Sequence, residues 1–286
     1  MTSTPTRPIE PRARPQQGFT LIELMIAVLI ALFLSAGLLT LVQAMKATAG
    51  VQSGLSQLQD SERMAMTLIA DVIQSAGYFP NPIINQAALE FPVTAPFSFA
   101  GQTSAFTAAG QSVVGAGSYG DPPLPANPSN SITVRYATGG TVAVPPLSPD
   151  NIINCTGNAS TVATTFTNTF SLLPDPSIPG IYDLVCQLSD SAAGTTNTVY
   201  LVSGVKQMQI YYGVQTNGGV TTGSVDTYLD ANAVTAGPYW NKVVSVKVTL
   251  TFVNPLYGTL AGQNTRPTTP PTIAFTRVID IMNKAN

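Results

Sequence analysis

An apolar run near the N-terminus constrains the fold of this chain more than any other feature. Residues 19–42 read FTLIELMIAVLIALFLSAGLLTLV, 24 residues with one ionisable side chain, Glu23. A helix of about 20 apolar residues spans the hydrocarbon core of a bilayer, which is about 30 Å thick. The run therefore predicts a transmembrane helix.

The residues before this run predict its orientation. Arg7, Arg12 and Arg14 outnumber the acid Glu10 within residues 1–18, and basic residues favour the cytoplasmic side. A secretory signal peptide also begins with basic residues, but its apolar part covers only about 7–15 residues. Here the run is longer, no A-x-A-like cleavage site follows it, and an acid lies near its start. We therefore expect a retained helix with a cytoplasmic N-terminus and an exported remainder.

Residues 18–25 read GFTLIELM and resemble the class III signal of type IV pilins and type II secretion pseudopilins. In that family a prepilin peptidase cleaves after the glycine and methylates the new N-terminal residue. The resemblance thus implies cleavage after Gly18, methylation of Phe19, and Glu23 as the fifth residue of the mature chain. It also implies that Glu23 pairs with the freed α-amino group of a neighbouring subunit and sets the axial register. An unpaired carboxylate in the hydrocarbon core costs about 2.5–3.5 kcal/mol, which supports such a partner.

The helix is predicted to continue beyond the membrane. No proline occurs in residues 16–79, and Gly77 supplies a stop signal. Gly37, Gly50 and Gly54 each reduce the stability of a helix by about 1 kcal/mol relative to alanine, so local bending is expected there. Apolar residues recur at three- and four-residue spacing and predict one face packed on a globular head: Leu55, Leu58, Ala65, Met66, Ile69, Val72, Ile73 and Ala76.

Residues 80–130 predict loop-dominated structure, because they are rich in Gly, Pro, Ser, Thr and Ala, and no charge occurs between Glu90 and Asp121. Five aromatic residues within this stretch favour an ordered excursion over a disordered linker. Strands are then predicted over residues 131–137, 141–144, 181–188, 198–214, 242–253 and 272–281. Residues 244–252 alternate apolar and polar side chains and are typical of a half-buried strand. The predicted fold class is α+β, a long N-terminal helix packed on an antiparallel sheet with long loops.

The chain contains two cysteines, Cys155 and Cys186, both in the part predicted to be exported. Oxidising conditions there permit a disulfide, and two cysteines allow a single pairing. The bridge would close a loop of about 31 residues and contribute roughly 3–4 kcal/mol in the chain-entropy model. A reactive thiol is the alternative reading, but the chain has no histidine to activate one.

Composition excludes several classes of function. With no histidine, a Ser-His-Asp triad, a Cys-His pair and a His-ligated zinc site are impossible. Charged residues make up 9% of the chain and the net charge is −2, so nucleic acid is not an expected partner. The sequence has neither a G-x-S-x-G motif nor a phosphate-binding loop. We therefore expect a protein that is not an enzyme and has no cofactor.

The C-terminal third resembles the PilW family of minor pilins. The resemblance rests on residues 61–63, 76–79, 205–214, 240–248 and 278–283. Two features depart from that family's pattern. The AGYFxC motif reads AGYFP here, and the acid-rich turn that resembles a calcium loop reads QTNGG at residues 215–219. Asp226 and Asp230 lie nearby, and we expect a turn and a solvated edge there rather than a metal site.

These patterns predict a structural subunit of a type IV pilus rather than a catalyst. Its partners would be a prepilin peptidase, other minor pilins, the major pilin and the inner membrane. It would prime assembly of the pilus and cap it, serving adhesion and twitching motility. There are two alternatives: a J-type pseudopilin of type II secretion, and a tip adhesin that binds a ligand through residues 80–130. The predicted parts are a leader (1–18), an assembly helix (19–42), its amphipathic continuation (43–79), the excursion (80–130) and the head (131–286).

Overall fold

The computed structural model describes residues 18, 20–83, 85–117, 130–142, 148–216, 224–255 and 271–282. The chain forms two compact units, residues 1–50 and residues 51–286. The helices in chain order are α1 (Leu21–Gln74), α2 (Ala87–Glu90), α3 (Ala231–Ala236) and the 3₁₀ helix η1 (Trp240–Lys242). The strands are β1 (Phe97–Phe99), β2 (Gln102–Ser104), β3 (Val113–Ala116), β4 (Ser131–Thr138), β5 (Thr164–Pro174), β6 (Tyr182–Asp190), β7 (Thr195–Val214), β8 (Thr227–Leu229), β9 (Val243–Val253) and β10 (Thr272–Asp280).

The first unit consists, in its described part, of the N-terminal portion of α1. Every described side chain up to Gly50 is exposed, including the large apolar ones from Leu21 to Met45. By length and composition, α1 is able to cross a membrane. It remains helical through all three of its glycines, Gly37, Gly50 and Gly54, so the expected bending is not accompanied by a break in the helix.

The second unit contains the rest of α1, which packs on the sheet through one face. The buried residues of that face are Leu58, Ala65, Met66, Ile69, Ala70, Val72 and Ile73. The helix ends just before Gly77, whose φ of 76° favours glycine, and the Gly77 N–H donates to the Arg135 carbonyl (3.0 Å). The amphipathic pattern of the sequence therefore identified the packed face correctly, with Leu55 only half-buried.

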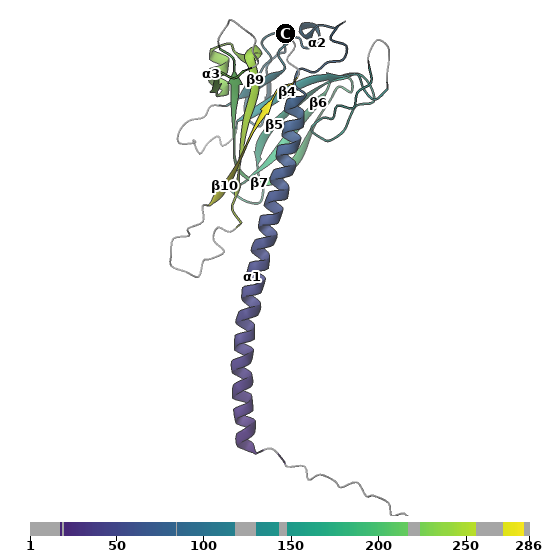
Figure 1. Ribbon diagram of the computed structural model, residues 1–286. Coiled ribbons are helices and arrows are strands. Elements are labelled where there is room, and N and C mark those ends of the chain that lie inside the picture. Colours follow the sequence, from purple (N-terminus) through teal and green to yellow (C-terminus); the bar gives the residue numbers. More distant parts are fainter. Residues whose placement is uncertain are drawn as a thin grey trace, which may run out of the picture. The chain divides into compact units, whose positions relative to one another are not determined.

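The sheet is antiparallel, eight-stranded and curled, in the order β10-β9-β7-β6-β5-β4-β3, with β8 also paired to β7 (Figure 1). The long strand β7 pairs with β6 from Thr195 to Val205 and with β9 from Val205 to Val214. Gly204 lies where the partner changes and has a φ of 82°, a conformation that β-branched residues avoid. This conformation lets one strand join the two halves of the sheet.

A single main core lies between α1 and the sheet. Ile132, Val134 and Tyr136 of β4 point toward it, as do Phe166 and Phe170 of the adjacent β5. The β4–β5 register places Tyr136 opposite Phe166, and their rings meet edge to face with centroids 5.9 Å apart. The predicted class, an α+β pilin-like helix packed on an antiparallel sheet, is confirmed.

Part of the excursion covers the other face of the sheet at β3 and β4. All eight residues of β4 are buried, because Thr133, Arg135 and Ala137 point away from α1 and are covered from that side. Phe79 and Phe91 pack there on Ala137, with their ring centroids 6.1 Å apart. The described residues of the excursion are therefore ordered. They form a layer that contains α2, β1 and β2, and they add β3 to the edge of the main sheet.

The predicted strands differ from the observed ones at several points. The short strands β1, β2, β3 and β8 form where no strand was predicted. The strand expected over residues 141–144 does not form at 141–142, and residues 143–144 lie outside the described chain. Strand β5 (Thr164–Pro174) was missed, although it occupies the middle of the sheet between β4 and β6. The other predicted strands match β4, β6, β7, β9 and β10 to within three residues at each end.

Candidate assembly site

Thr20 and Glu23 form a capping box at the start of α1. Because the helix begins at Leu21, Thr20 is its N-cap and Glu23 its third residue. The Glu23 Oε2 atom accepts from the Thr20 N–H (3.0 Å) and from the Thr20 hydroxyl (2.9 Å). The Thr20 Oγ1 atom in turn accepts from the Glu23 N–H (3.4 Å). This reciprocal pattern satisfies two donors that the helix itself leaves unpaired.

The capping box uses one carboxylate oxygen of Glu23 and leaves the other available. Glu23 Oε1 has no hydrogen-bond partner in the described chain, and the side chain is exposed. Negative charge at a helix N-terminus is also stabilised by the helix dipole. Sequence reasoning assigned Glu23 to pairing between subunits and missed its cap, although T-x-x-E before an apolar run is a readable signal of one.

The apolar side chains on either side of Glu23 remain uncovered in the isolated chain. Leu21, Ile22, Leu24 and Met25 lie within the first turns of the helix, and each is more than half exposed. Water strongly disfavours so much apolar surface, so this helix requires lipid or other apolar helices around it. The exposed helix and its capped, acidic start together form a surface suited to packing among similar helices.

Comparison with known protein families agrees with this geometry at both ends of the chain. The prokaryotic N-terminal methylation motif matches residues 13–39, which include the capping box and the first part of the apolar helix. The type IV pilus-assembly protein W model, PilW, matches residues 175–278, which run from the end of β5 almost to the end of β10. These two matches support a PilW-like type IV minor pilin. Comparisons with curated proteins and with solved structures give no match.

The two matched regions of this PilW-like pilin correspond to the assembly helix and to the C-terminal part of the sheet. The PilW family consists of structural pilus-assembly proteins, and the chain accordingly has a pilin role in pilus assembly. Such a role involves contact with other pilus components and a membrane anchor. The region between the two matches contains the part of the head that these comparisons do not cover, which includes the excursion, β4 and β5.

The residues predicted to undergo processing lie just before the helix. Gly18 is exposed, and a Cβ atom added there would meet no atom within 4 Å. Phe19 lies outside the described residues. Cleavage after Gly18 and methylation of Phe19 thus remain predictions of the motif. The open surroundings of Gly18 are useful experimentally, because a larger side chain there will not disturb the fold.

The structure brings the two cysteines of this pilin together in a disulfide. Cys155 and Cys186 are bonded, with their Cα atoms 6.4 Å apart, and both side chains are fully buried. The bond ties the loop before β5 to the centre of β6. The Cys155 N–H also donates to the Oδ1 atom of buried Asn168 (2.9 Å), so strand β5 holds the same loop. The predicted disulfide is therefore present and anchors an irregular segment to the sheet.

Asp226 and Asp230, which lie near the turn compared with a calcium loop, stabilise local backbone in this structure. The Asp226 Oδ2 atom accepts from the Thr216 N–H (2.8 Å), and Asp230 caps α3 by accepting from the Ala233 N–H (2.7 Å). The intervening residues 217–223 lie outside the described chain. No three of His, Cys, Asp or Glu gather at one point among the residues that the structure describes.

Proposed function

We propose that this PilW-like pilin is a low-copy subunit that primes assembly of a type IV pilus and caps it. A prepilin peptidase would remove the leader after Gly18 and methylate Phe19. The protein would wait in the inner membrane, with its N-terminus in the cytoplasm and its head in the periplasm. Companion minor pilins and the major pilin would then cover the exposed helix, and the resulting pilus would serve adhesion and twitching motility.

The main support for this proposal is the apolar helix with its capped glutamate. All large apolar side chains from Leu21 to Met45 are exposed, and Glu23 retains one free carboxylate oxygen in the described chain. Lipid would cover the apolar side chains but would leave that oxygen without a partner. A neighbouring pilin would supply both an apolar helix and, at its new N-terminus, a positive α-amino group. The helix therefore suits assembly better than simple anchoring.

The function is best tested in a strain that lacks this protein and cannot retract pili. Pili sheared from its surface and proteins exported by type II secretion are measured side by side, with a complemented strain as the control. Loss of pili with normal secretion is the expected result. Loss of secretion with normal pili would instead assign the protein to the J-type pseudopilins. No change in either measurement would contradict an assembly role and favour a tip adhesin.

Replacing Gly18 by leucine should leave the protein at its precursor mass. The expected cause is the chemistry of cleavage rather than misfolding, because an added side chain at Gly18 meets open space. Gly37→Leu is a matched control, since a Cβ atom there also meets no atom within 4 Å. Mass spectrometry of the membrane fraction should show uncleaved Gly18→Leu and fully cleaved Gly37→Leu. Normal cleavage of Gly18→Leu would remove the processing assignment.

A further inference from the structure

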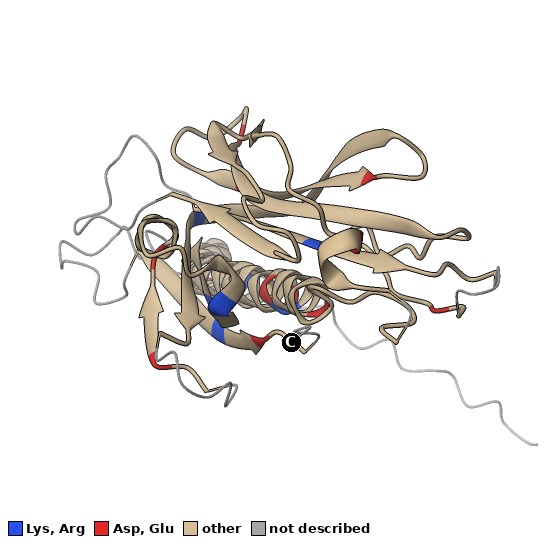
Figure 2. Ribbon diagram, turned by 90° about the horizontal axis from the view of Figure 1, so that it is seen from above, with Lys and Arg blue, Asp and Glu red and all other residues tan. Residues whose placement is uncertain are grey.

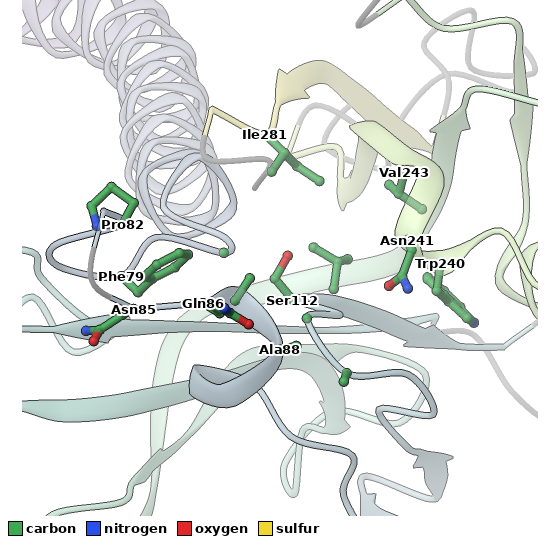
Figure 3. A pocket seen from close by; sticks show the side chains of 15 residues that line it. Phe79, Pro82, Asn85, Gln86, Ala88, Ser112, Trp240, Asn241, Val243 and Ile281 are labelled. Atoms are coloured by element: carbon green, nitrogen blue, oxygen red, sulfur yellow. The ribbon is translucent and has the colours of Figure 1, made fainter. Parts of the chain in front are cut away.

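A pocket of about 630 Å³ opens at the end of the head where α1 finishes. Its lining comes from four separate segments: residues 77–88 after the helix, residues 109–113 before β3, residues 240–243 around η1, and Ile281 after β10. Figure 3 shows Ile281 and Val243 facing Gln86 and Ser112 across the pocket, with Phe79 at one end and Asn241 at the other. The volume lies within the range of about 300–1,000 Å³ that is usual for ligand sites.

The described residues that line the pocket are all uncharged. None of its described lining residues is Asp, Glu, Lys or Arg. Figure 2, which views the head from this end, shows how thinly charged residues are spread over the described chain. Phosphates and carboxylates are normally held by Arg or Lys, and hard cations by carboxylates. The pocket is therefore unsuited to either kind of ion and calls for a neutral ligand.

Three polar side chains of the lining have no partner within the described protein. The amides of Gln86 and Asn241 and the hydroxyl of Ser112 make no intramolecular hydrogen bond in the described chain. Each amide offers two N–H donors and one carbonyl acceptor, and the hydroxyl offers one donor and two lone pairs. An entirely apolar ligand would displace water from these groups without replacing its hydrogen bonds. Gln86 and Asn241 are exposed and Ser112 is half-buried, so all three groups are open to a ligand at the mouth of the pocket. A ligand with several hydroxyl or amide groups of its own would satisfy them.

Apolar side chains lie beside these polar groups. Phe79, Val243 and Ile281 line the same pocket, and Phe79 and Val243 are buried in the head. The wall around η1 is held in place, because Trp240 donates its Nε1–H to the Thr235 hydroxyl (3.1 Å) and packs edge to face on Tyr212. Asn241 follows Trp240 directly, so its amide is presented from a fixed backbone. A site that is already ordered loses less entropy when a ligand binds.

We propose that this pocket binds a neutral saccharide. A sugar ring displays hydroxyl groups around its edge and C–H groups on its faces, which matches amides and a hydroxyl alternating with apolar side chains. The absence of charged residues from the described part of the lining fits an uncharged sugar better than a sialylated or phosphorylated one. This inference goes beyond a role in assembly, because it gives the head a ligand that no companion pilin provides.

The experiment uses the full-length protein in micelles of lauryldimethylamine oxide, a detergent without a sugar headgroup. Saturation-transfer difference NMR is recorded with three probes, lactose, maltose and N,N′-diacetylchitobiose, and the Kd of any binder is obtained by titration. We expect saturation transfer to at least one of these disaccharides. The double variant Gln86→Ala/Asn241→Ala should raise its Kd roughly ten-fold or more, because two hydrogen-bonding amides are lost.

Two further variants keep the result interpretable. Gln57→Ala/Asn232→Ala removes two exposed amides outside the pocket and should change the Kd less than two-fold. Ala88→Trp places a large ring on the rim without removing a polar group, and it should abolish binding while leaving the disulfide intact. Binding of none of the three sugars would overturn the proposal. So would a Kd that is unchanged in both pocket variants, since the sugar would then bind elsewhere.

Discussion

The variant Glu23→Gln is expected to fold and be cleaved normally but to enter pili at least ten-fold less often than the native protein. Glutamine retains an oxygen that accepts hydrogen bonds, so the capping box with Thr20 is preserved. It lacks the negative charge that would pair with the α-amino group of a neighbouring subunit. Removing one partner of a buried ion pair costs about 3–5 kcal/mol, which is enough for this loss.

A matched control separates the two roles of this carboxylate. Thr20→Val removes the hydroxyl that shares in the capping box but leaves the charge of Glu23 in place. Losing an N-cap costs about 1 kcal/mol, and a helix surrounded by lipid or other helices tolerates that loss. Immunoblots of sheared pili, normalised to the membrane pool of cleaved protein, measure incorporation of both variants. We expect Thr20→Val to be incorporated nearly as well as the native chain.

The opposite ranking would give Glu23 a different role. If Glu23→Gln were incorporated normally and Thr20→Val poorly, the glutamate would act only as a helix cap, and the proposal that it sets the register would fail. If both variants were excluded, the geometry of the helix start and the charge would both be required. Cleavage is measured in the same samples, because a defect at the peptidase would otherwise be mistaken for a defect in assembly.

The helix and most of the sheet could be predicted because their patterns are local. Residues 244–252 alternate strictly, and the buried face of α1 repeats every three or four residues, so each element shows its own packed side in the sequence. The disulfide could be predicted as directly, since Cys155 and Cys186 are the only two cysteines in the sequence. These predictions needed no knowledge of which segments meet in space.

Strand β5 was missed because its inward face contains a polar residue. Phe166, Phe170 and Leu172 point to the core, but Asn168 occupies the position between the two phenylalanines and is fully buried. Buried asparagine normally needs hydrogen bonds, and here Oδ1 is satisfied by the Cys155 N–H from a loop that the disulfide also holds. The strand thus depends on a contact that sequence periodicity cannot show.

The pocket and the folded excursion could not be predicted for a related reason. Gln86, Ser112 and Asn241 are ordinary polar residues in loops or short elements, and only the tertiary fold brings them together. The excursion was recognised as ordered from its aromatic residues, but the residue that fixes it, Arg135, lies outside it on β4. Its position within a predicted strand gave one clue, since Arg135 alternates with Ile132, Val134 and Tyr136 and should face away from the core.

Arg135 is expected to be the most sensitive position in the head. Its side chain is only 3% exposed, yet its guanidinium carries a charge. Nε donates to the Gln111 carbonyl (2.7 Å), Nη1 to the Pro92 carbonyl (2.7 Å) and Nη2 to the Phe91 carbonyl (3.1 Å). The Cζ atom also lies 3.9 Å from the centroid of the Phe106 ring and 5.4 Å from that of Phe91. One side chain thus connects two separate segments of the excursion, residues 91–92 and 106–111, to the sheet.

Burial lowers the pKa of Arg135 to about 10, which still leaves it protonated at neutral pH. Five donors on a rigid plane allow arginine to serve three carbonyls at once, which lysine cannot do. Arg135→Met should therefore reduce the free energy of unfolding by about 2–5 kcal/mol, because the buried carbonyls of Phe91 and Gln111 lose their donor. Arg135→Lys should fall between Arg135→Met and the native protein, since one ammonium group satisfies fewer carbonyls.

Urea unfolding of the full-length protein at constant detergent, followed by Trp240 fluorescence, measures these differences. Arg277→Met is the matched control, because Arg277 is exposed and makes one long hydrogen bond, from Nη1 to the Met66 carbonyl (3.4 Å). We expect Arg277→Met to reduce the free energy of unfolding by less than about 1 kcal/mol, as substitutions of exposed residues usually do. Limited proteolysis should cut Arg135→Met within residues 80–116 while the disulfide-linked part of the head stays intact. Equal stability of Arg135→Met and Arg277→Met would show that the excursion is held by its apolar contacts alone. The pocket, which the excursion helps to line, would then be unchanged by the loss of Arg135.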